Sequence, residues 1–161
     1  MQSCLCAQGP PGAPGGHTTI LVSVGLASSQ IVMPGFFASS LLFSLPIAGN
    51  SGGWFDTVNG VFTAPIAGIY LVSFSGSSSV ALDGAVVEVQ IVKLSKRMSQ
   101  VATTSVSHPA DSVLQAMTLS TTVSLEAGDS ILVMASCPVG CLFQGFTNTG
   151  GYVTTLTISK Q

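Results

Sequence analysis

Short runs of β-type residues, separated by turn residues, fill the chain from residue 18 onward. Apolar and polar positions alternate within these runs, and no stretch shows the 3.6-residue period of a helix. The runs that we interpret as strands are Thr18–Val24, Gly68–Phe74, Ala85–Leu94, Gln115–Leu125, Ile131–Ala135 and Tyr152–Ser159. Turn dipeptides precede two of them, at Asp83-Gly84 and Gly128-Asp129. Many short strands with regular turns predict an all-β sandwich or barrel.

A Gly- and Pro-rich segment precedes the first run. It consists of three successive Gly-X-Y triplets, which are Gly9-Pro10-Pro11, Gly12-Ala13-Pro14 and Gly15-Gly16-His17. Collagen has Gly at every third position because only a hydrogen fits where three chains meet at the axis. A flexible linker has a similar composition, so both interpretations stay open. We divide the chain into residues 1–17, a peptide with a short collagen-like stem, and residues 18–161, a β domain.

Aromatic and small residues at fixed spacings lie between Asn50 and Phe74. The six positions are Asn50, Phe55, Phe62, Gly68, Tyr70 and Phe74. In these spacings the chain resembles the globular head of the complement C1q and tumour necrosis factor superfamily. Two positions depart from the pattern: Ser44 stands where a Phe is expected, with Phe43 beside it, and Val72 replaces an aromatic residue. A second segment, Leu125–Ile131, resembles the family's turn into its penultimate strand.

The resemblance implies a ten-stranded jelly-roll sandwich that assembles as a homotrimer, often on a collagen stem. It also implies that the six signature residues belong to the core and form no ligand site. Phe143–Phe146 superficially matches the family's last-strand motif, but the chain continues to Gln161. We therefore expect Phe143–Phe146 in a long loop, followed by a closing strand at residues 151–159. The stem and head together are similar to bacterial or viral collagen-stemmed surface proteins.

Charged residues are only 6% of the chain, against about 25% in an average soluble domain. The net charge of -2 provides no surface for nucleic acid or anionic lipid. The one basic cluster, at Lys93, Lys96 and Arg97, is interpreted as a solvated strand end. Hydrophobic residues reach 47%, but no uninterrupted apolar run of about 18 residues predicts a membrane span. A surface so poor in charge favours self-association.

The chemistry-bearing residues form no catalytic pattern. The acidic residues Asp56, Asp83, Glu88, Asp111, Glu126 and Asp129 are scattered along the chain. His108 and Asp111 are close in sequence, but a polar loop explains them better than a catalytic dyad. Neither His17 nor His108 has a zinc-ligand partner at motif spacing. We expect no enzyme activity, no metal and no cofactor.

Four cysteines form two pairs, Cys4 with Cys6 and Cys137 with Cys141. If the fold follows the family, the stem leaves from the base of the head, and the Cys137–Cys141 loop lies at the opposite apex. Disulfides between the two pairs would then join trimers head to tail. A local Cys137–Cys141 bond, with Cys4 and Cys6 linking the chains of one stem, is an alternative, and free thiols are another.

These observations predict a structural protein. We expect a trimeric subunit of an extracellular or spore-surface fibre, with trimers joined through the stem, and itself as the principal partner. An alternative is a receptor- or glycan-binding head at the tip of a collagen-like stalk or phage fibre. A soluble cytokine-like ligand is a third interpretation, weakened by the short stem. Residues 1–4 do not read as a secretory signal, which leaves two alternatives open: a mature, processed chain, or a route by assembly or lysis instead of general secretion.

Overall fold

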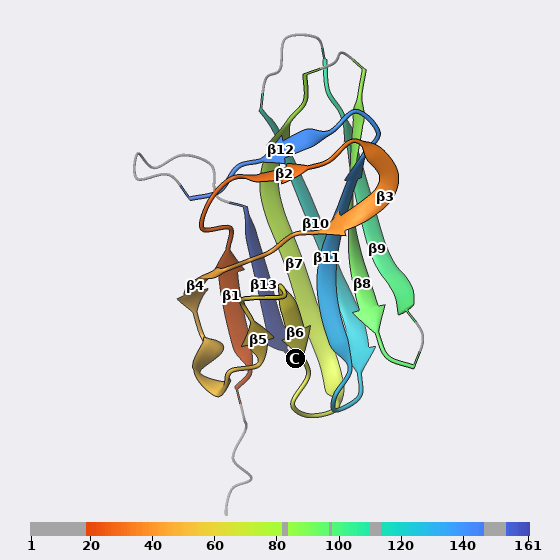
Figure 1. Cartoon of the computed structure of the whole chain (residues 1–161). Coiled ribbons are helices and arrows are strands. Elements are labelled where there is room, and N and C mark those ends of the chain that lie inside the picture. The colour runs from red at the N-terminus through yellow and green to blue at the C-terminus, as the bar shows by residue number, and fades with distance from the viewer. Residues whose placement is uncertain (1–18, 82–83, 97, 110–113, 147–153) are drawn as a thin grey trace, which may run out of the picture.

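The computed structural model describes residues 19–81, 84–96, 98–109, 114–146 and 154–161, and its regular secondary structure is almost entirely β-strand (Figure 1). One short 3-10 turn, Asn50–Gly52, is the exception within these residues. The strands are β1 Leu21–Gly25, β2 Gln30–Val32, β3 Gly35–Ser40, β4 Leu45–Ala48, β5 Phe55–Asp56, β6 Val61–Thr63, β7 Gly68–Ser79, β8 Val86–Leu94, β9 Met98–Ser107, β10 Gln115–Leu125, β11 Ser130–Cys137, β12 Cys141–Phe143 and β13 Thr155–Lys160.

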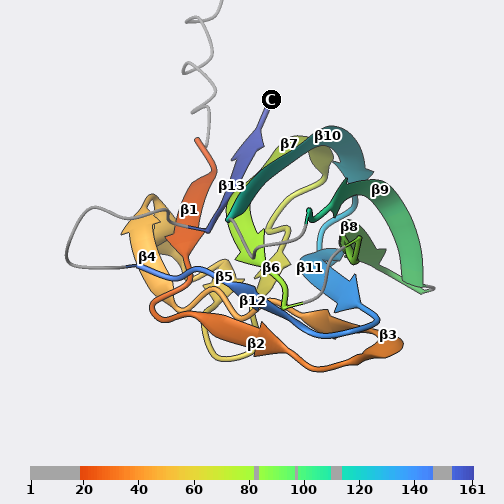
Figure 2. The same ribbon diagram turned by 90° about the horizontal axis from the view of Figure 1, so that it is seen from above.

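The strands form two antiparallel sheets packed face to face (Figures 1 and 2). The first sheet has the order β2-β12-β7-β13-β1-β4, and β10 pairs with the other edge of β7. The second sheet has the order β5-β6-β11-β8-β9, with β3 also pairing with β11. The predicted all-β jelly-roll sandwich is therefore confirmed. The described residues hold more strands than the ten implied by the resemblance, because several strands are short or interrupted.

The core lies between the two sheets and follows the two-residue period of the strands. In β7 the side chains of Tyr70, Val72 and Phe74 are buried, while the intervening residues point to the other face. The facing sheet contributes alternate residues of β8 and β11, such as Val89 and Val133. The aromatic and β-branched residues of these runs thus form strands because one side of each strand is removed from water.

The sequence pattern located most long strands to within a few residues. β10 has the predicted bounds, whereas β7 continues five residues beyond the predicted end at Phe74, because the serines that follow still pair with β10. The strand β9 was not predicted. Its residues are mostly Ser, Thr and Gln, and half or more of them are exposed, so the run lacks the apolar alternation that marks a strand.

The placement of Phe143–Phe146 in a loop was wrong for its first residue. Phe143 belongs to β12 and is fully buried, and it pairs with Ser78 of β7. The next residue, Gln144, donates its N–H to the Ser77 carbonyl at 3.0 Å. β13 then takes up the same edge of β7 with Thr155 opposite Ser75. β12 and β13 therefore pair one after the other with the same edge of β7, and residues 145–153 connect them.

The two ends of β7 mark the two ends of the molecule. Lys160 of β13 pairs with Tyr70 at one end, where Leu21 of β1 also lies opposite Ser159. Leu142 of β12 pairs with Ser79 at the other end. At about 3.4 Å per residue, these ends are roughly 30 Å apart. The first described residues and the C-terminus thus lie at the base, and the Cys137–Cys141 turn lies toward the apex (Figure 1).

Candidate assembly surface

The outward side of the first sheet is lined with hydroxyl groups. Register places one residue of each of four strands in a row: Ser23 of β1, Thr157 of β13, Ser73 of β7 and Ser120 of β10. The Ser73 and Ser120 hydroxyl oxygens are 2.5 Å apart, and those of Ser23 and Thr157 are 3.3 Å apart. Side chains that hydrogen-bond to their neighbours in the plane of the sheet leave a flat surface.

The adjacent rows continue this pattern. Thr155, Ser75 and Thr118 form the next row toward the apex. The next row toward the base alternates apolar with polar residues and contains Leu21, Ser159, Leu71 and Thr122. We call these three rows the hydroxyl face. None of the charged residues that the structure describes belongs to the hydroxyl face, so one copy could cover another there without burying an unpaired charge.

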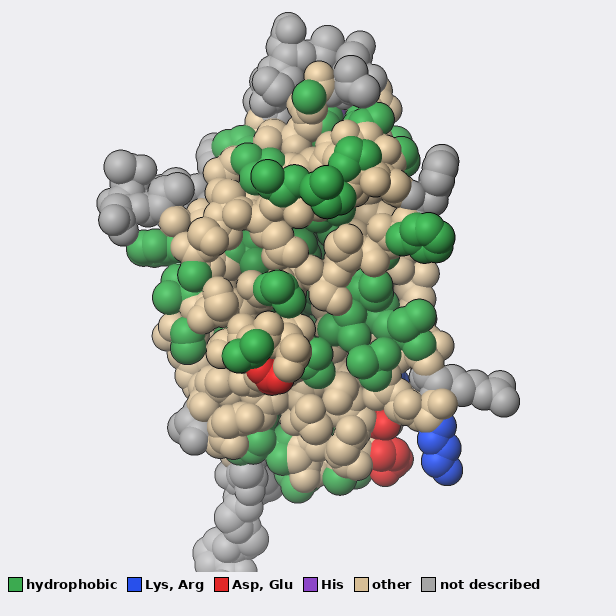
Figure 3. Space-filling model, in the orientation of Figure 1, with side chains coloured by type: hydrophobic (Ala, Val, Ile, Leu, Met, Phe, Trp, Pro, Cys, Tyr) green, Lys and Arg blue, Asp and Glu red, His purple; other side chains and the backbone are tan. Residues whose placement is uncertain are grey.

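The described charged residues lie elsewhere, and Figure 3 shows only a few of them on the side that it presents. Lys93 forms an ion pair with Asp129, with Nζ and Oδ2 2.8 Å apart, beside the turn between β10 and β11. This contact with Lys93, together with the Glu126 N–H, lowers the pKa of the Asp129 carboxyl. Of the predicted basic cluster, Lys93 is thus engaged in an ion pair, and Arg97 lies outside the described residues.

Cys137 and Cys141 flank the tight turn between β11 and β12. The Gly140 N–H donates to the Cys137 carbonyl at 3.1 Å, and Gly140 has a φ of 83°, which favours glycine. Both cysteines are buried and neither forms a disulfide, and their side chains are neighbours. Cys137 is 0% exposed and Cys141 is 5% exposed. Cys141 is therefore the better placed of the two for a link to another chain, whereas Cys4 and Cys6 lie outside the described residues, as does the stem from Gly9 to His17.

We expect the native Cys141 thiol to react slowly with a disulfide reagent. Burial, and secondarily the adjacent Cys137, raise its pKa from 9.0 to about 12. The thiolate fraction at pH 8 falls about a thousandfold, and the higher intrinsic nucleophilicity of a more basic thiolate restores part of the rate. The net rate should be at least about thirtyfold below that of an exposed thiol. A time course of thiol labelling in a Cys4→Ser/Cys6→Ser chain measures it, and fast labelling without denaturant would contradict the buried geometry.

The six signature residues are placed in or beside the core. The Asn50 side chain bonds the Phe55 backbone in both directions, donating from Nδ2 to the carbonyl at 3.2 Å and accepting the N–H at 3.1 Å. Phe55, Phe62, Tyr70 and Phe74 are buried. Gly68 begins β7, where an added Cβ would lie 2.6 Å from the Lys160 side chain.

Two further contacts explain the aromatic pattern. The Tyr70 hydroxyl donates to the Ile66 carbonyl at 2.7 Å, and burial raises its pKa. Phe43 is fully buried and packs edge-on against Phe74, with ring centroids 6.5 Å apart. Phe43, and not the exposed Ser44, therefore supplies the ring that the family pattern expects one residue later.

No catalytic arrangement is seen among the described residues. His108 lies 3.1 Å from the Ser78 hydroxyl through Nε2, but both residues are buried and a substrate could not reach them. Asp111 lies outside the described residues. Within the described part of the chain, no three His, Cys, Asp or Glu residues gather as a metal site would require. The same part holds no helix of the length and hydropathy needed to cross a bilayer.

The hydroxyl face was not predicted from the sequence, although the sequence contains a pattern that marks it. Ser or Thr recurs at every second position in three strands, as in Thr118, Ser120 and Thr122 of β10. Such a recurrence marks the outward side of a strand, but only the register shows that the three strands are neighbours.

Comparison with known proteins agrees with this architecture. No curated protein sequence matches the chain. Among solved structures it is similar to Eiger TNF from S. frugiperda, with a TM-score of 0.68 and 11% identity over 89% of this chain and 92% of that one. The globular domain of zebrafish complement 1qA gives 0.61 and 14%, over 88% and 96%. Murine APRIL gives 0.60 and 15%, over 89% and 99%.

At such low sequence identity, these structural similarities show the fold alone. The sequence itself carries a family relationship, because a model described as the C1q domain matches residues 28–150. The matched range contains all six signature residues and extends from the loop before β2 to the residues between β12 and β13. The chain therefore belongs to the C1q domain family.

Proposed function

We propose that the chain is a structural protein whose subunit is a homotrimer formed through the hydroxyl face. C1q and TNF domains commonly form homotrimers. The observation that carries the proposal is the absence of any described charged residue from the rows around Ser73 and Ser120. A flat surface of hydroxyl and aliphatic groups suits close contact between copies, because hydroxyl groups can exchange partners across an interface.

The trimers join head to tail through the N-terminal stem. The first described residues lie at the base, and the Cys141 turn lies at the apex, so a stem that reaches the next apex makes a heterologous contact. Such contacts do not close on themselves and produce filaments. The Gly-X-Y triplets suit this arrangement, because a collagen-like stem needs the three chains that a trimeric head brings together.

Disulfides then lock the contact. Cys4 or Cys6 of one trimer bonds with Cys141 of the next, and the reaction releases two protons and two electrons. An oxidant such as dioxygen or a low-molecular-weight disulfide accepts them, so locking belongs in an oxidising location. C1q-like domains are typically extracellular or secreted and non-enzymatic. The proposed role is accordingly a subunit of an extracellular or spore-surface fibre.

Two measurements on the purified chain test this function. Negative-stain microscopy should show filaments at moderate protein concentration, and non-reducing gels should show a ladder above the trimer that reductant collapses. A Cys4→Ser/Cys6→Ser chain should lose the ladder, whereas a Ser3→Ala chain, as a neighbouring control, should keep it. Discrete trimers at every concentration would contradict the fibre and favour a receptor- or glycan-binding head.

A further inference from the structure

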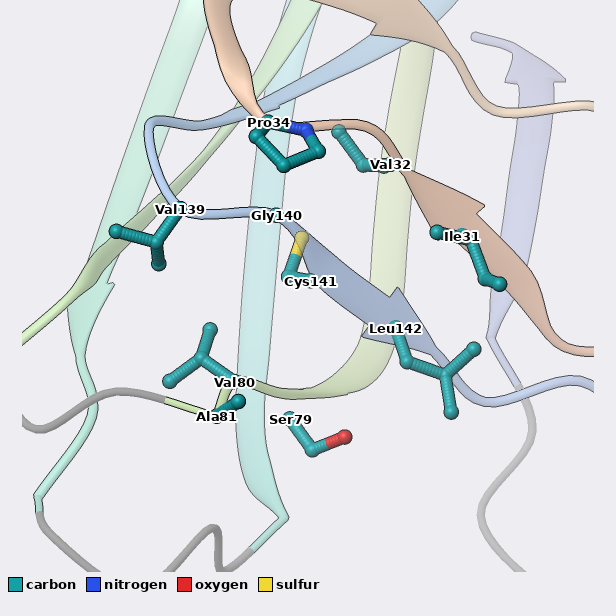
Figure 4. Close-up of a pocket in the computed structure, with 10 residues that line it drawn as sticks. All are labelled: Ile31, Val32, Pro34, Ser79, Val80, Ala81, Val139, Gly140, Cys141 and Leu142. Atoms are coloured by element: carbon teal, nitrogen blue, oxygen red, sulfur yellow. The ribbon is translucent and has the colours of Figure 1, made fainter.

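An open apolar pocket of 490 Å³ lies at the apex beside the cysteine turn (Figure 4). Its walls come from three segments: β2, the end of β7, and the stretch from the β11–β12 turn into β12. The apolar side chains include Ile31, Val80, Val139 and Leu142. None of the lining residues carries a charge, and Ser79 has the only hydroxyl group among them. The pocket therefore suits an uncharged, aliphatic group.

The rim of this pocket leaves much apolar surface in water. Ile31 is 67% exposed and Val139 is 37% exposed, although each has an aliphatic side chain that gains from burial. Cys141 is also part of the wall and has the one thiol among the lining residues, so it alone of them can form a disulfide. A partner that fits here combines an aliphatic group with a neighbouring thiol.

The chain itself contains such a segment. Residues 1–8 read Met-Gln-Ser-Cys-Leu-Cys-Ala-Gln, which places Leu5 between two cysteines and includes no charged side chain. This segment precedes β1, which begins at the base, at the opposite end of the molecule from the pocket. Residues 9–18 would span about 30 Å at the polyproline rise of 3.1 Å per residue. A peptide from one trimer can therefore reach the apex of the next.

We infer that the apical pocket is the docking site for residues 1–8 of the neighbouring trimer, with Leu5 seated among Ile31, Val139 and Leu142. This inference rests on the proposed head-to-tail assembly and specifies which residues of two neighbouring trimers contact each other. A trimer offers three such peptides and three such pockets, so each junction is made by three equivalent contacts. Docking brings Cys4 or Cys6 beside Cys141. The effective concentration of the Cys4 or Cys6 thiol near Cys141 is then high, which offsets the low reactivity of the Cys141 thiol.

The test is made on the full chain in reductant, so that only non-covalent docking is measured. A Val139→Asp substitution places a carboxylate in the pocket and should raise the protein concentration needed for filaments at least about tenfold, because docking would bury an unpaired charge. Val58→Asp is the matched control, since Val58 is 78% exposed and outside this pocket. Its threshold should stay within about twofold of the unsubstituted chain.

A charge-pair rescue tests the contact itself. Leu5→Lys alone should impair assembly as Val139→Asp does, and the combined chain should recover most of it, because the ammonium group introduced on the docked peptide then meets the carboxylate in the pocket. Light scattering checks that every variant remains a trimer.

If Val139→Asp leaves the protein concentration needed for filaments unchanged while the unsubstituted chain forms filaments, the docking site is wrong, but the proposed fibre is not contradicted. If Val139→Asp yields monomers, the pocket belongs to the trimer interface and the docking site is again wrong. If the unsubstituted chain forms filaments only without reductant, non-covalent docking in the pocket is wrong, and if it forms none even without reductant, the proposed function fails as well.

Discussion

A Ser120→Arg chain should purify as a monomer. Ser120 lies in the middle row of the hydroxyl face, on β10, where its hydroxyl is 2.5 Å from that of Ser73. The side chain is exposed in the single chain, so the substitution leaves the core untouched. In the trimer it would place three guanidinium groups against surfaces that offer no described carboxylate, and such mismatches cost several kcal/mol. The trimer dissociation constant should rise by about a thousandfold or more.

Light scattering coupled to size-exclusion chromatography measures this change directly. Ser105→Arg is the matched control, because Ser105 is an exposed residue near the end of β9 on the other sheet and lies opposite Glu88. That chain should remain a trimer. A Ser120→Arg chain that still elutes as a trimer would show that assembly uses another surface.

Phe74→Ala should destabilise the fold by about 3–5 kcal/mol, the range for removing a large buried aromatic side chain. Phe74 joins both halves of the core, because its ring packs edge-on against Phe43 and against Phe143, at centroid distances of 6.5 and 6.4 Å. The cavity left behind would remove both ring contacts at once. β13 would also lose packing, since Leu156 is paired with Phe74.

Denaturant unfolding measures this loss, and both chains are compared at one protein concentration because trimer formation adds to apparent stability. Phe37→Ala is the control, since Phe37 is 89% exposed and should change the free energy of unfolding by less than about 0.5 kcal/mol. Equal losses in the two variants would mean that the ring stack around Phe74 contributes little.

The strands and the core positions could be predicted because their signals are local, whereas the jelly-roll arrangement was predicted from the family resemblance. Alternation within runs such as Gln115–Leu125 reflects one buried side of a strand, and it can be recognised without knowing the partner strand. The spacing from Phe55 to Phe74 likewise reflects side chains that meet in one core. Ser44 seemed to break the pattern, but Phe43 provides the buried ring, so a shift by one residue kept the core filled.

The assembly surface and the apical pocket depend on contacts distant in sequence. Ser23 and Ser120 share a row only because β13 and β7 lie between them in a given register. Ile31 and Leu142 come together because β12 pairs with β2. Such proximities follow from strand order, which composition and periodicity do not specify. The error at Phe143 has the same origin, because a strand that stops and resumes along one neighbour looks like a loop in sequence.

The interruption between β12 and β13 has a practical consequence for engineering. The Thr154 N–H donates to the Gln144 carbonyl at 3.2 Å, so the connecting residues leave and return at nearly the same point. Pairing with β7 sets the register of both β12 and β13. Lengthening the connection between them costs only about 0.6 kcal/mol of free energy for each doubling of its length. Foreign peptides inserted between Gln144 and Thr154 should therefore be carried without shifting either strand. A filament built from such chains would display three copies of a chosen epitope at every repeat.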